Sequence, residues 1–178
     1  MLITKEYQDQ NKLLHIQNKD YGGGGQRRKK DILPIIAKYK PESILDYGCG
    51  KGLLAKSMSQ HNWQEYDPCI PGKNSLPTAC DLVVCCDVLE HVEPELIENV
   101  IEHIKILTNK VAFFCIGLRP ANKTLPDGRN THISLFPKEK WLGIIHRYFC
   151  IIDHRGTKGK FFITGEPFND SDMRTLVR

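Results

Sequence analysis

Long apolar stretches are missing from this sequence, and so are paired cysteine motifs. No apolar run approaches the about 18 residues that a membrane-spanning helix needs. The first residues, MLITKEYQDQNK, are too polar for a secretory signal peptide. The seven cysteines are an odd number, form no CxxC pair, and lie mostly in apolar runs. These absences argue against a membrane protein, a disulfide scaffold and a zinc site, and we expect a cytoplasmic protein.

Internal repeats and low-complexity tracts are also missing, apart from four glycines at residues 22–25. The 178 residues, 40% hydrophobic and 26% charged, suit one globular domain with a sizeable core. Residues 1–25 are polar and end in DYGGGG, which predicts a flexible amino-terminal arm. We therefore expect a single domain over residues 26–178, preceded by this arm.

Apolar runs of strand length alternate with amphipathic helical patterns along the chain. Helical spacing predicts helices within residues 29–39, 93–108 and 137–149. Strands are expected at residues 43–47, 63–66, 81–86, 110–116, 150–153 and 161–164. This alternation predicts an α/β fold with a mostly parallel sheet flanked by helices.

The stretch SILDYGCGKGLLAK, residues 43–56, reads as a strand, a glycine-rich turn and a helix. Such turns hold phosphates or cofactors at helix amino termini. A P-loop is excluded because Gly52 is followed by Leu53, not by the lysine and hydroxyl that phosphates need. The D-x-G-x-G-x-G spacing also differs from the dinucleotide pattern. A carboxylate at Asp46 would repel a pyrophosphate but favour the ammonium of an amino-acid-bearing ligand such as S-adenosylmethionine.

A resemblance to a known family is carried by three segments, ILDYGCGKG, WQEYDP and NSLPTACDLVVCCDVLEHV. From about residue 40 onward, the sequence resembles the class I S-adenosylmethionine-dependent methyltransferases. More narrowly, it is similar to a small bacterial and phage-type methyltransferase-like group. The resemblance implies a Rossmann-like fold, S-adenosylmethionine as cofactor and S-adenosylhomocysteine as product. It also implies that Asp67 accepts hydrogen bonds from the ribose and that residues 75–77 line the adenine. The cofactor-binding residues implied are Asp46, Gly48, Gly50, Gly52, Asp67, Pro68, Leu76, Cys86 and Asp87.

The chain departs from the family pattern after the second strand. Only 13 residues separate Asp67 from Asp81, where the full fold usually fits a helix, a strand and another helix. We therefore predict a fold trimmed between the second and fourth strands, with the adenine side of the pocket poorly covered. The arm NKDYGGGGQRR is a candidate lid, in which Tyr21 contacts the cofactor and the glycines form a hinge. The alternative is a disordered terminus.

Acceptor chemistry is expected in GLRPANKTLPDGRNTHISLFP, residues 117–137, which follow the strand expected at 110–116. Ligands of α/β proteins bind at this carboxyl edge of the sheet. We predict His132 as general base or substrate orienter, because its pKa suits proton transfer near neutrality. Arg119 and Arg129 could clamp an anionic acceptor, and Asn130 could add a directional hydrogen bond. Alternatively, these residues satisfy the backbone of a turn at 126–128.

The turn from Asp87 to His91 has a D-x-x-E-H spacing similar to the metal site of small-RNA 2′-O-methyltransferases, with His132 as a conceivable extra ligand. The same letters are common in metal-free methyltransferases, where the histidine caps or orients the turn. We therefore expect no metal site.

Basic charge is concentrated in the predicted acceptor region. Residues 119–160 carry nine Lys or Arg against three Asp or Glu, whereas the whole chain has a net charge of only +4. This balance, together with QRRKK at 26–30, favours an anionic small molecule or nucleotide as methyl acceptor. A nucleic-acid methyltransferase and a non-catalytic S-adenosylmethionine-binding protein are the alternatives. The D-P-P-Y motif of amino-directed DNA methyltransferases is absent.

Overall fold

A computed structural model describes residues 1–168, so residues 169–178, the end of the predicted domain, lie outside the described part. One six-stranded sheet has the order β2-β1-β3-β4-β6-β5. The first four of these strands run parallel, and β6 runs antiparallel to both of its neighbours. The strands are β1 (Ile44–Tyr47), β2 (Trp63–Tyr66), β3 (Cys80–Cys86), β4 (Thr108–Gly117), β5 (Phe149–Gly156) and β6 (Lys160–Pro167). This Rossmann-like arrangement confirms the predicted fold class.

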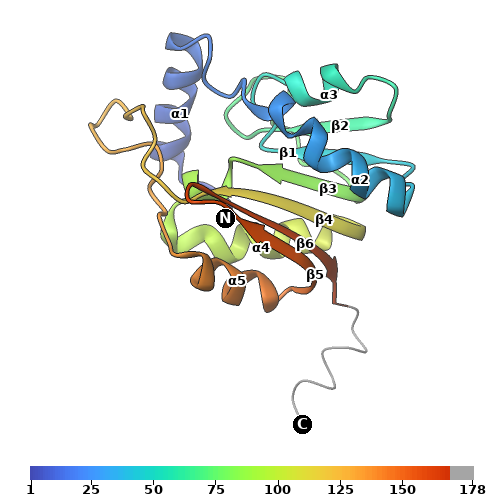
Figure 1. Cartoon of the computed structure of the whole chain (residues 1–178). Coiled ribbons are helices and arrows are strands. Elements are labelled where there is room, and N and C mark those ends of the chain that lie inside the picture. Colours follow the sequence, from blue (N-terminus) through green and yellow to red (C-terminus); the bar gives the residue numbers. More distant parts are fainter. Residues whose placement is uncertain (169–178) are drawn as a thin grey trace.

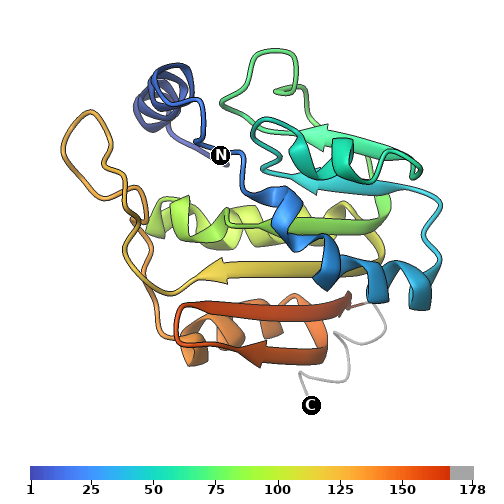
Figure 2. The same ribbon diagram turned by 45° about the horizontal axis from the view of Figure 1, so that its top comes forward.

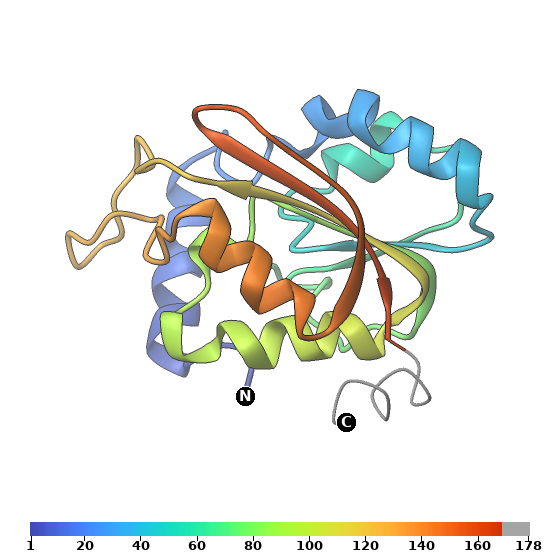
Figure 3. The ribbon, with the colours of Figure 1, turned by 60° about the horizontal axis from the view of Figure 1, so that its bottom comes forward.

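Two layers of helices cover the sheet (Figures 1 and 3). Helices α2 (Lys29–Tyr39) and α3 (Leu53–Ser57) cover one face, while α4 (Ile97–Ile106) and α5 (Lys138–His146) cover the other. Strand β3 shows why: Leu82 and Val84 pack with α2 and α3, whereas Val83 and Cys85 pack with α4 and α5. A strand buried on both faces needs a continuous apolar run, and CDLVVCC supplies it.

Short 3₁₀ segments connect these elements at Gly25–Arg28, Leu89–His91 (η2) and Pro94–Leu96. Within residues 1–168, no helix is long and apolar enough to cross a bilayer.

The sheet ends at β2, as the short spacing after Asp67 predicts. Residues 68–79 form turns, and no strand or helix lies between β2 and β3 in the described chain. The edge of β2 is partly covered by Thr78, whose backbone N–H donates to Gln64 Oε1 at 2.8 Å. The trimmed fold is therefore observed, with the edge strand held by a side chain in place of a further strand.

The last two strands extend beyond the apolar runs that predict them. They form an antiparallel hairpin, in which polar residues of β5 from Asp153 to Gly156 pair with β6 from Thr164 to Phe161. Backbone hydrogen bonding lengthens these strands because a ladder needs no apolar side chain at every position. The hairpin also brings Lys160 opposite Gly117 of β4.

Residues 1–25, predicted as a flexible arm, contain helix α1 (Lys5–Gln17). Thr4 caps this helix by accepting a hydrogen bond from Tyr7 N–H at 3.3 Å. Tyr7, Asn11 and Leu14 form its buried face. Figures 1 and 2 show α1 at one end of the sheet, beside the loop of residues 118–137. The arm therefore has a helix that sequence reasoning did not predict, and its action as a lid stays a prediction.

Candidate active site

The glycine turn after β1 is held open by positive backbone angles. Gly48 and Gly50 have φ of 75° and 50°, a region that glycine adopts without steric cost. A Cβ atom at Gly50 would lie 2.5 Å from the carbonyl oxygen of Gly22, which also accepts a hydrogen bond from Lys51 N–H at 3.0 Å. The glycines thus allow the amino-terminal segment and the turn to approach closely.

Asp67 follows β2 and fixes the glycine turn. Its Oδ2 accepts a hydrogen bond from Gly50 N–H at 2.9 Å, and its Oδ1 accepts one from Cys69 N–H at 2.8 Å. Each carboxylate oxygen has a second lone pair, so Asp67 can still accept hydrogen bonds from a ligand. The side chain is buried but lines the cavity described below.

Asp46 is the most unusual carboxylate of this region. It lies at the end of β1, is 4% exposed, and accepts no hydrogen bond on its side chain among residues 1–168. Burial, with a smaller contribution from the neighbouring Glu65, raises its pKa to about 7. A cationic group beside Asp46 would favour the charged carboxylate of this residue. Such a group could bind in the cavity that Asp46 lines.

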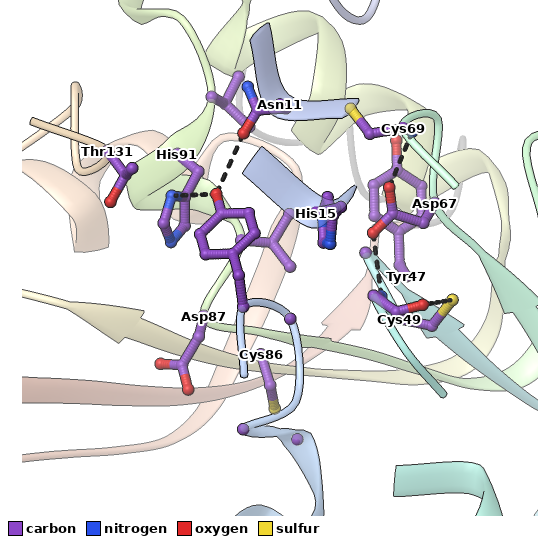
Figure 4. Close-up of a pocket in the computed structure, with 18 of the residues that line it drawn as sticks. Asn11, His15, Tyr47, Cys49, Asp67, Cys69, Cys86, Asp87, His91 and Thr131 are labelled. Atoms are coloured by element: carbon purple, nitrogen blue, oxygen red, sulfur yellow. Dashed lines mark hydrogen bonds between the residues drawn. The ribbon is translucent and has the colours of Figure 1, made fainter. Parts of the chain in front are cut away.

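These residues line a cavity of about 490 Å³ at the carboxyl ends of β1 to β4. Figure 4 shows Asp67, Cys49 and Tyr47 on one side and His91, Asp87 and Thr131 on the other. Tyr7 and Asn11 of α1, together with Tyr21, cover the cavity, and we call these three residues its roof. The volume lies within the range of small-molecule binding sites, about 300–1,000 Å³.

Hydrogen bonds tie the roof to the cavity wall. The Tyr7 hydroxyl donates to the carbonyl of His91 at 2.6 Å, and the Tyr21 hydroxyl donates to Asn11 Oδ1 at 3.0 Å. Burial raises the pKa of Tyr7 to about 12, so its hydroxyl stays protonated and can donate. The Tyr21 hydroxyl also lies 3.5 Å from His91 Nδ1. Figure 4 draws the contacts of this hydroxyl with Asn11 and with His91. The segment from α1 to Tyr21 is therefore part of the site.

Most of the predicted cofactor-binding residues share this cavity. Gly52 and Leu76 do not line it. Gly52 faces a separate shallow hollow with Lys73, and Leu76 is 73% exposed on the turn after β2. The predicted residues that do line the cavity are Tyr21, Asp46, Gly48, Gly50, Asp67, Pro68, Cys86 and Asp87.

Of the four predicted catalytic residues, only His132 lines the cavity. Arg119 Nε donates to the carbonyl of Lys158 at 3.0 Å, and Arg129 forms an exposed ion pair with Asp127. The Asn130 side chain bonds the backbone N–H and carbonyl of Ala121, both at 2.9 Å. Arg119 thus contacts the β5–β6 connection, Asn130 bridges two parts of the loop and Arg129 pairs with the turn at Asp127, so the acceptor roles expected for these three residues stay predictions.

His132 lies against His91, with ring centroids 4.6 Å apart. Its Nδ1 is 2.5 Å from the Arg119 carbonyl, which must accept a hydrogen bond from a protonated Nδ1 and so leaves Nε2 with a lone pair. Burial lowers the pKa of His132, and burial together with the neighbouring His132 lowers that of His91 to about 3. Both imidazoles are therefore neutral near pH 7.

Sequence reasoning missed several lining residues, among them Lys160, Asn11 and His15. Lys160 forms an ion pair with Asp87, a contact that the β4–β6 register creates. Nothing in the local sequence marks this pairing. For α1 a signal existed, because Tyr7, Asn11 and Leu14 follow the capping Thr4 at helical spacing.

Comparisons with known proteins agree with this arrangement. A family model described as a methyltransferase domain matches residues 21–148. No curated protein matches the chain significantly by sequence. The chain is structurally similar to the 1,6-didemethyltoxoflavin-N1-methyltransferase of Burkholderia thailandensis, solved with 1,6-didemethyltoxoflavin and S-adenosylhomocysteine, with a TM-score of 0.68 and 15% identity over 92% of this chain and 90% of that one.

Two other solved structures show the same fold. The N-methyltransferase NodS of Bradyrhizobium japonicum, in complex with S-adenosylhomocysteine, has a TM-score of 0.60 and 14% identity, over 80% of this chain and 87% of that one. The magnesium protoporphyrin IX methyltransferase of Synechocystis, also with S-adenosylhomocysteine, has a TM-score of 0.59 and 17% identity, over 84% and 86%.

Proposed function

Because the chain belongs to the methyltransferase-domain family and is an S-adenosylmethionine-dependent methyltransferase, we propose that it methylates a small anionic molecule or nucleotide. The similar structures are named for small acceptors, a toxoflavin precursor and a porphyrin, which supports this size class. The cavity supports it too, because about 490 Å³ must hold the cofactor together with the reacting part of the acceptor.

The cofactor half of the cavity fits S-adenosylmethionine chemically. Asp46 is a buried carboxylate without a protein partner in the described chain, and the ammonium of the ligand would supply its countercharge. Asp67 keeps lone pairs for ribose hydroxyls, and Gly48 and Gly50 line the same cavity. We assign Asp46, Gly48, Gly50 and Asp67 to this binding.

The acceptor half combines basic and imidazole groups. The anionic character proposed for the acceptor rests on Lys123, which lines the cavity. Its Nζ donates to Asn18 Oδ1 at 2.8 Å, and among residues 1–168 no carboxylate forms an ion pair with it. Lys160, in contrast, is neutralised by Asp87. An acceptor carboxylate or phosphate beside Lys123 would supply the counterion that this lysine lacks in the described chain.

Methyl transfer requires the chain to position the acceptor, to exclude water from the site and to accept one proton where the acceptor releases one. S-adenosylmethionine supplies an electrophilic methyl group on a sulfonium leaving group when it is bound. Lys123 would orient the acceptor, and the roof formed by Tyr7, Asn11 and Tyr21 would exclude water. His132 would either take the proton released by the acceptor at Nε2 or orient the acceptor atom that attacks the methyl carbon.

The test is conversion of labelled S-adenosylmethionine to S-adenosylhomocysteine with nucleoside monophosphates and aromatic carboxylates, each paired with its neutral analogue. We expect turnover with an anionic member only, and Lys123→Gln should raise its KM by about tenfold with little change in kcat. Lys138→Gln, an exposed lysine on α5, is the matched control. Equal turnover of the neutral analogue would remove the anionic requirement. Cofactor binding without any turnover would favour the non-catalytic alternative, and turnover of RNA or DNA alone would favour the polymer alternative.

A further inference from the structure

Three potential metal ligands meet behind the acceptor wall of the cavity. Glu90, His91 and His132 each offer one ligand atom, and these atoms all lie within 4.8 Å of one another. Glu90 and His91 belong to η2, whereas His132 belongs to the loop of residues 118–137. Figure 4 shows His91 beside Thr131, the residue before His132. The cluster thus joins two segments that are far apart in the sequence.

The strongest sign of a missing ligand is at Glu90. Its side chain is 0% exposed, and its Oε1 accepts a hydrogen bond from Gly117 N–H at 2.6 Å. Its Oε2 is buried and has no hydrogen-bond partner within the described residues. A buried carboxylate oxygen without a partner is costly, so this one calls for a ligand that is absent from the chain itself.

The two histidines are prepared to bind a cation. Hydrogen bonding of His132 Nδ1 to the Arg119 carbonyl leaves Nε2 free, and metal-bound histidines commonly hold their second nitrogen in this way. His91 contacts the Tyr21 hydroxyl only at 3.5 Å, a weak hydrogen bond. Both rings line the cavity, so positions on a bound ion would open toward it.

Space for this cluster depends on Gly117 at the end of β4. A Cβ atom there would lie 2.5 Å from Glu90 Oε1 and 2.9 Å from His132 Cε1. The absent side chain therefore lets the carboxylate and the imidazole approach the same point. The nearby Asp87 and Lys160 form an ion pair with each other, and no ion pair to Glu90 is formed within the described residues.

We propose that Glu90, His91 and His132 bind one divalent transition-metal cation. Two imidazoles and one carboxylate with open positions form a ligand set typical of first-row metals such as Mn²⁺ and Co²⁺. Two ligands about 2.1 Å from one ion are at most about 4.2 Å apart, and atoms that all lie within 4.8 Å of one another reach such an arrangement with no more than small side-chain rotations. The sequence analysis expected no metal here because the same motif is common in metal-free methyltransferases, and the unpartnered Glu90 oxygen is the observation that the sequence lacks. With the ion bound, His132 orients the acceptor through the metal and does not take its proton.

The experiment uses untagged full-length protein, stripped with a chelator, dialysed and titrated with CoCl₂ while visible absorption is recorded. We expect one Co²⁺ per chain, with ligand-field bands. Glu90→Gln keeps the hydrogen bond to Gly117 and His132→Asn keeps a polar side chain, yet each should weaken Co²⁺ binding at least tenfold. His61→Asn, a histidine outside the cavity, should leave Co²⁺ affinity unchanged.

The proposal is overturned if stripped wild-type protein binds no Co²⁺, or if Glu90→Gln and His132→Asn bind it as tightly as wild type. S-adenosylhomocysteine affinity, measured in parallel, reports whether each variant is folded. If Glu90→Gln does not fold, His132→Asn decides, because His132 lies in a loop. The readout needs no acceptor, so a failure here is distinct from a failure of the proposed methylation.

Discussion

The two walls of the cavity are built in different ways. The cofactor wall consists of the glycine turn, Asp46 and Asp67, which lie within a short stretch at the ends of neighbouring parallel strands. The acceptor wall brings together η2, the loop of residues 118–137 and Lys160, and α1 covers both walls. Local backbone geometry therefore shapes the first wall, whereas the second depends on contacts between segments that are distant in sequence. The two walls should respond differently to substitution.

The largest effect is expected on the acceptor wall. Once an acceptor is known, His132→Ala should lower kcat by roughly 100-fold or more, because it removes the base or orienting group. S-adenosylhomocysteine affinity, measured by calorimetry, should stay within about twofold, since His132 does not contact the glycine turn. His154→Ala on β5 is the control. A fully active His132→Ala enzyme would leave proximity alone to explain transfer on this wall.

On the cofactor wall, Gly50→Ala should weaken S-adenosylhomocysteine binding by about 100-fold, the equivalent of overpacking by nearly 3 kcal/mol. The added Cβ would meet the Gly22 backbone at 2.5 Å. Gly72→Ala makes a matched control, because its φ is also positive, at 84°, but a Cβ there meets nothing within 4 Å. Calorimetry of S-adenosylhomocysteine binding to both variants separates the effect of the steric clash from that of backbone strain. If both variants lose the same affinity, the effect comes from strain and not from the clash.

A smaller effect should appear in the pH dependence of cofactor binding. Burial holds the pKa of Asp46 at about 7 in the free protein. An adjacent ammonium favours the carboxylate and lowers this pKa, so binding releases a proton and tightens as pH rises toward 7. Affinity for S-adenosylhomocysteine should increase by up to about tenfold between about pH 5.5 and about pH 7.

Asp46→Asn should flatten this pH profile, because the amide does not titrate. The range stays below about pH 8, where the ligand's own α-amino group loses its proton. A profile that keeps its slope in Asp46→Asn would assign the proton to another group and place the ammonium elsewhere.

The smallest effect concerns the roof formed by Tyr7 and Asn11 of α1 and by Tyr21. Tyr21→Phe removes the hydrogen bond to Asn11 and should weaken S-adenosylhomocysteine binding by about fivefold, close to 1 kcal/mol. Tyr39→Phe removes a comparable hydroxyl contact to Glu166 far from the cavity and serves as the control. If the two variants bind S-adenosylhomocysteine with the same affinity, the Tyr21 hydrogen bond does not contribute to cofactor binding. The proposed role of the arm as a lid then loses its support.

The sheet, and the grouping of the glycine turn with Asp46 and Asp67 along one cavity, could be predicted from the sequence because both leave local signals. The apolar run of β3 and the spacing of Gly48 and Gly50 are readable within a few residues. The acceptor wall is different. Arg119 and Arg129 looked like acceptor clamps, but the fold directs them to a backbone carbonyl and to Asp127.

Two other parts of the site, the Lys160–Asp87 pair and helix α1, were missed for different reasons. Lys160 reaches Asp87 through the register of β4 with β6, which the sequence does not reveal. Helix α1 was missed because its buried face includes the polar Asn11, whose amide donates to the carbonyl of Tyr7. Composition alone predicts a polar arm there, and tertiary contacts override it.

The position of α1 has a consequence for how the chain assembles. Thr4 donates hydrogen bonds to Glu93 across 89 residues, and Tyr7 bonds the carbonyl of His91 across 84. A polar helix of 13 residues is only marginally stable by itself. During synthesis α1 leaves the ribosome before η2 and the sheet, yet its docking surface exists only after η2 has been made and the parallel strands have paired. We therefore expect the roof to form late in folding, after the long-range contacts of the sheet have been established.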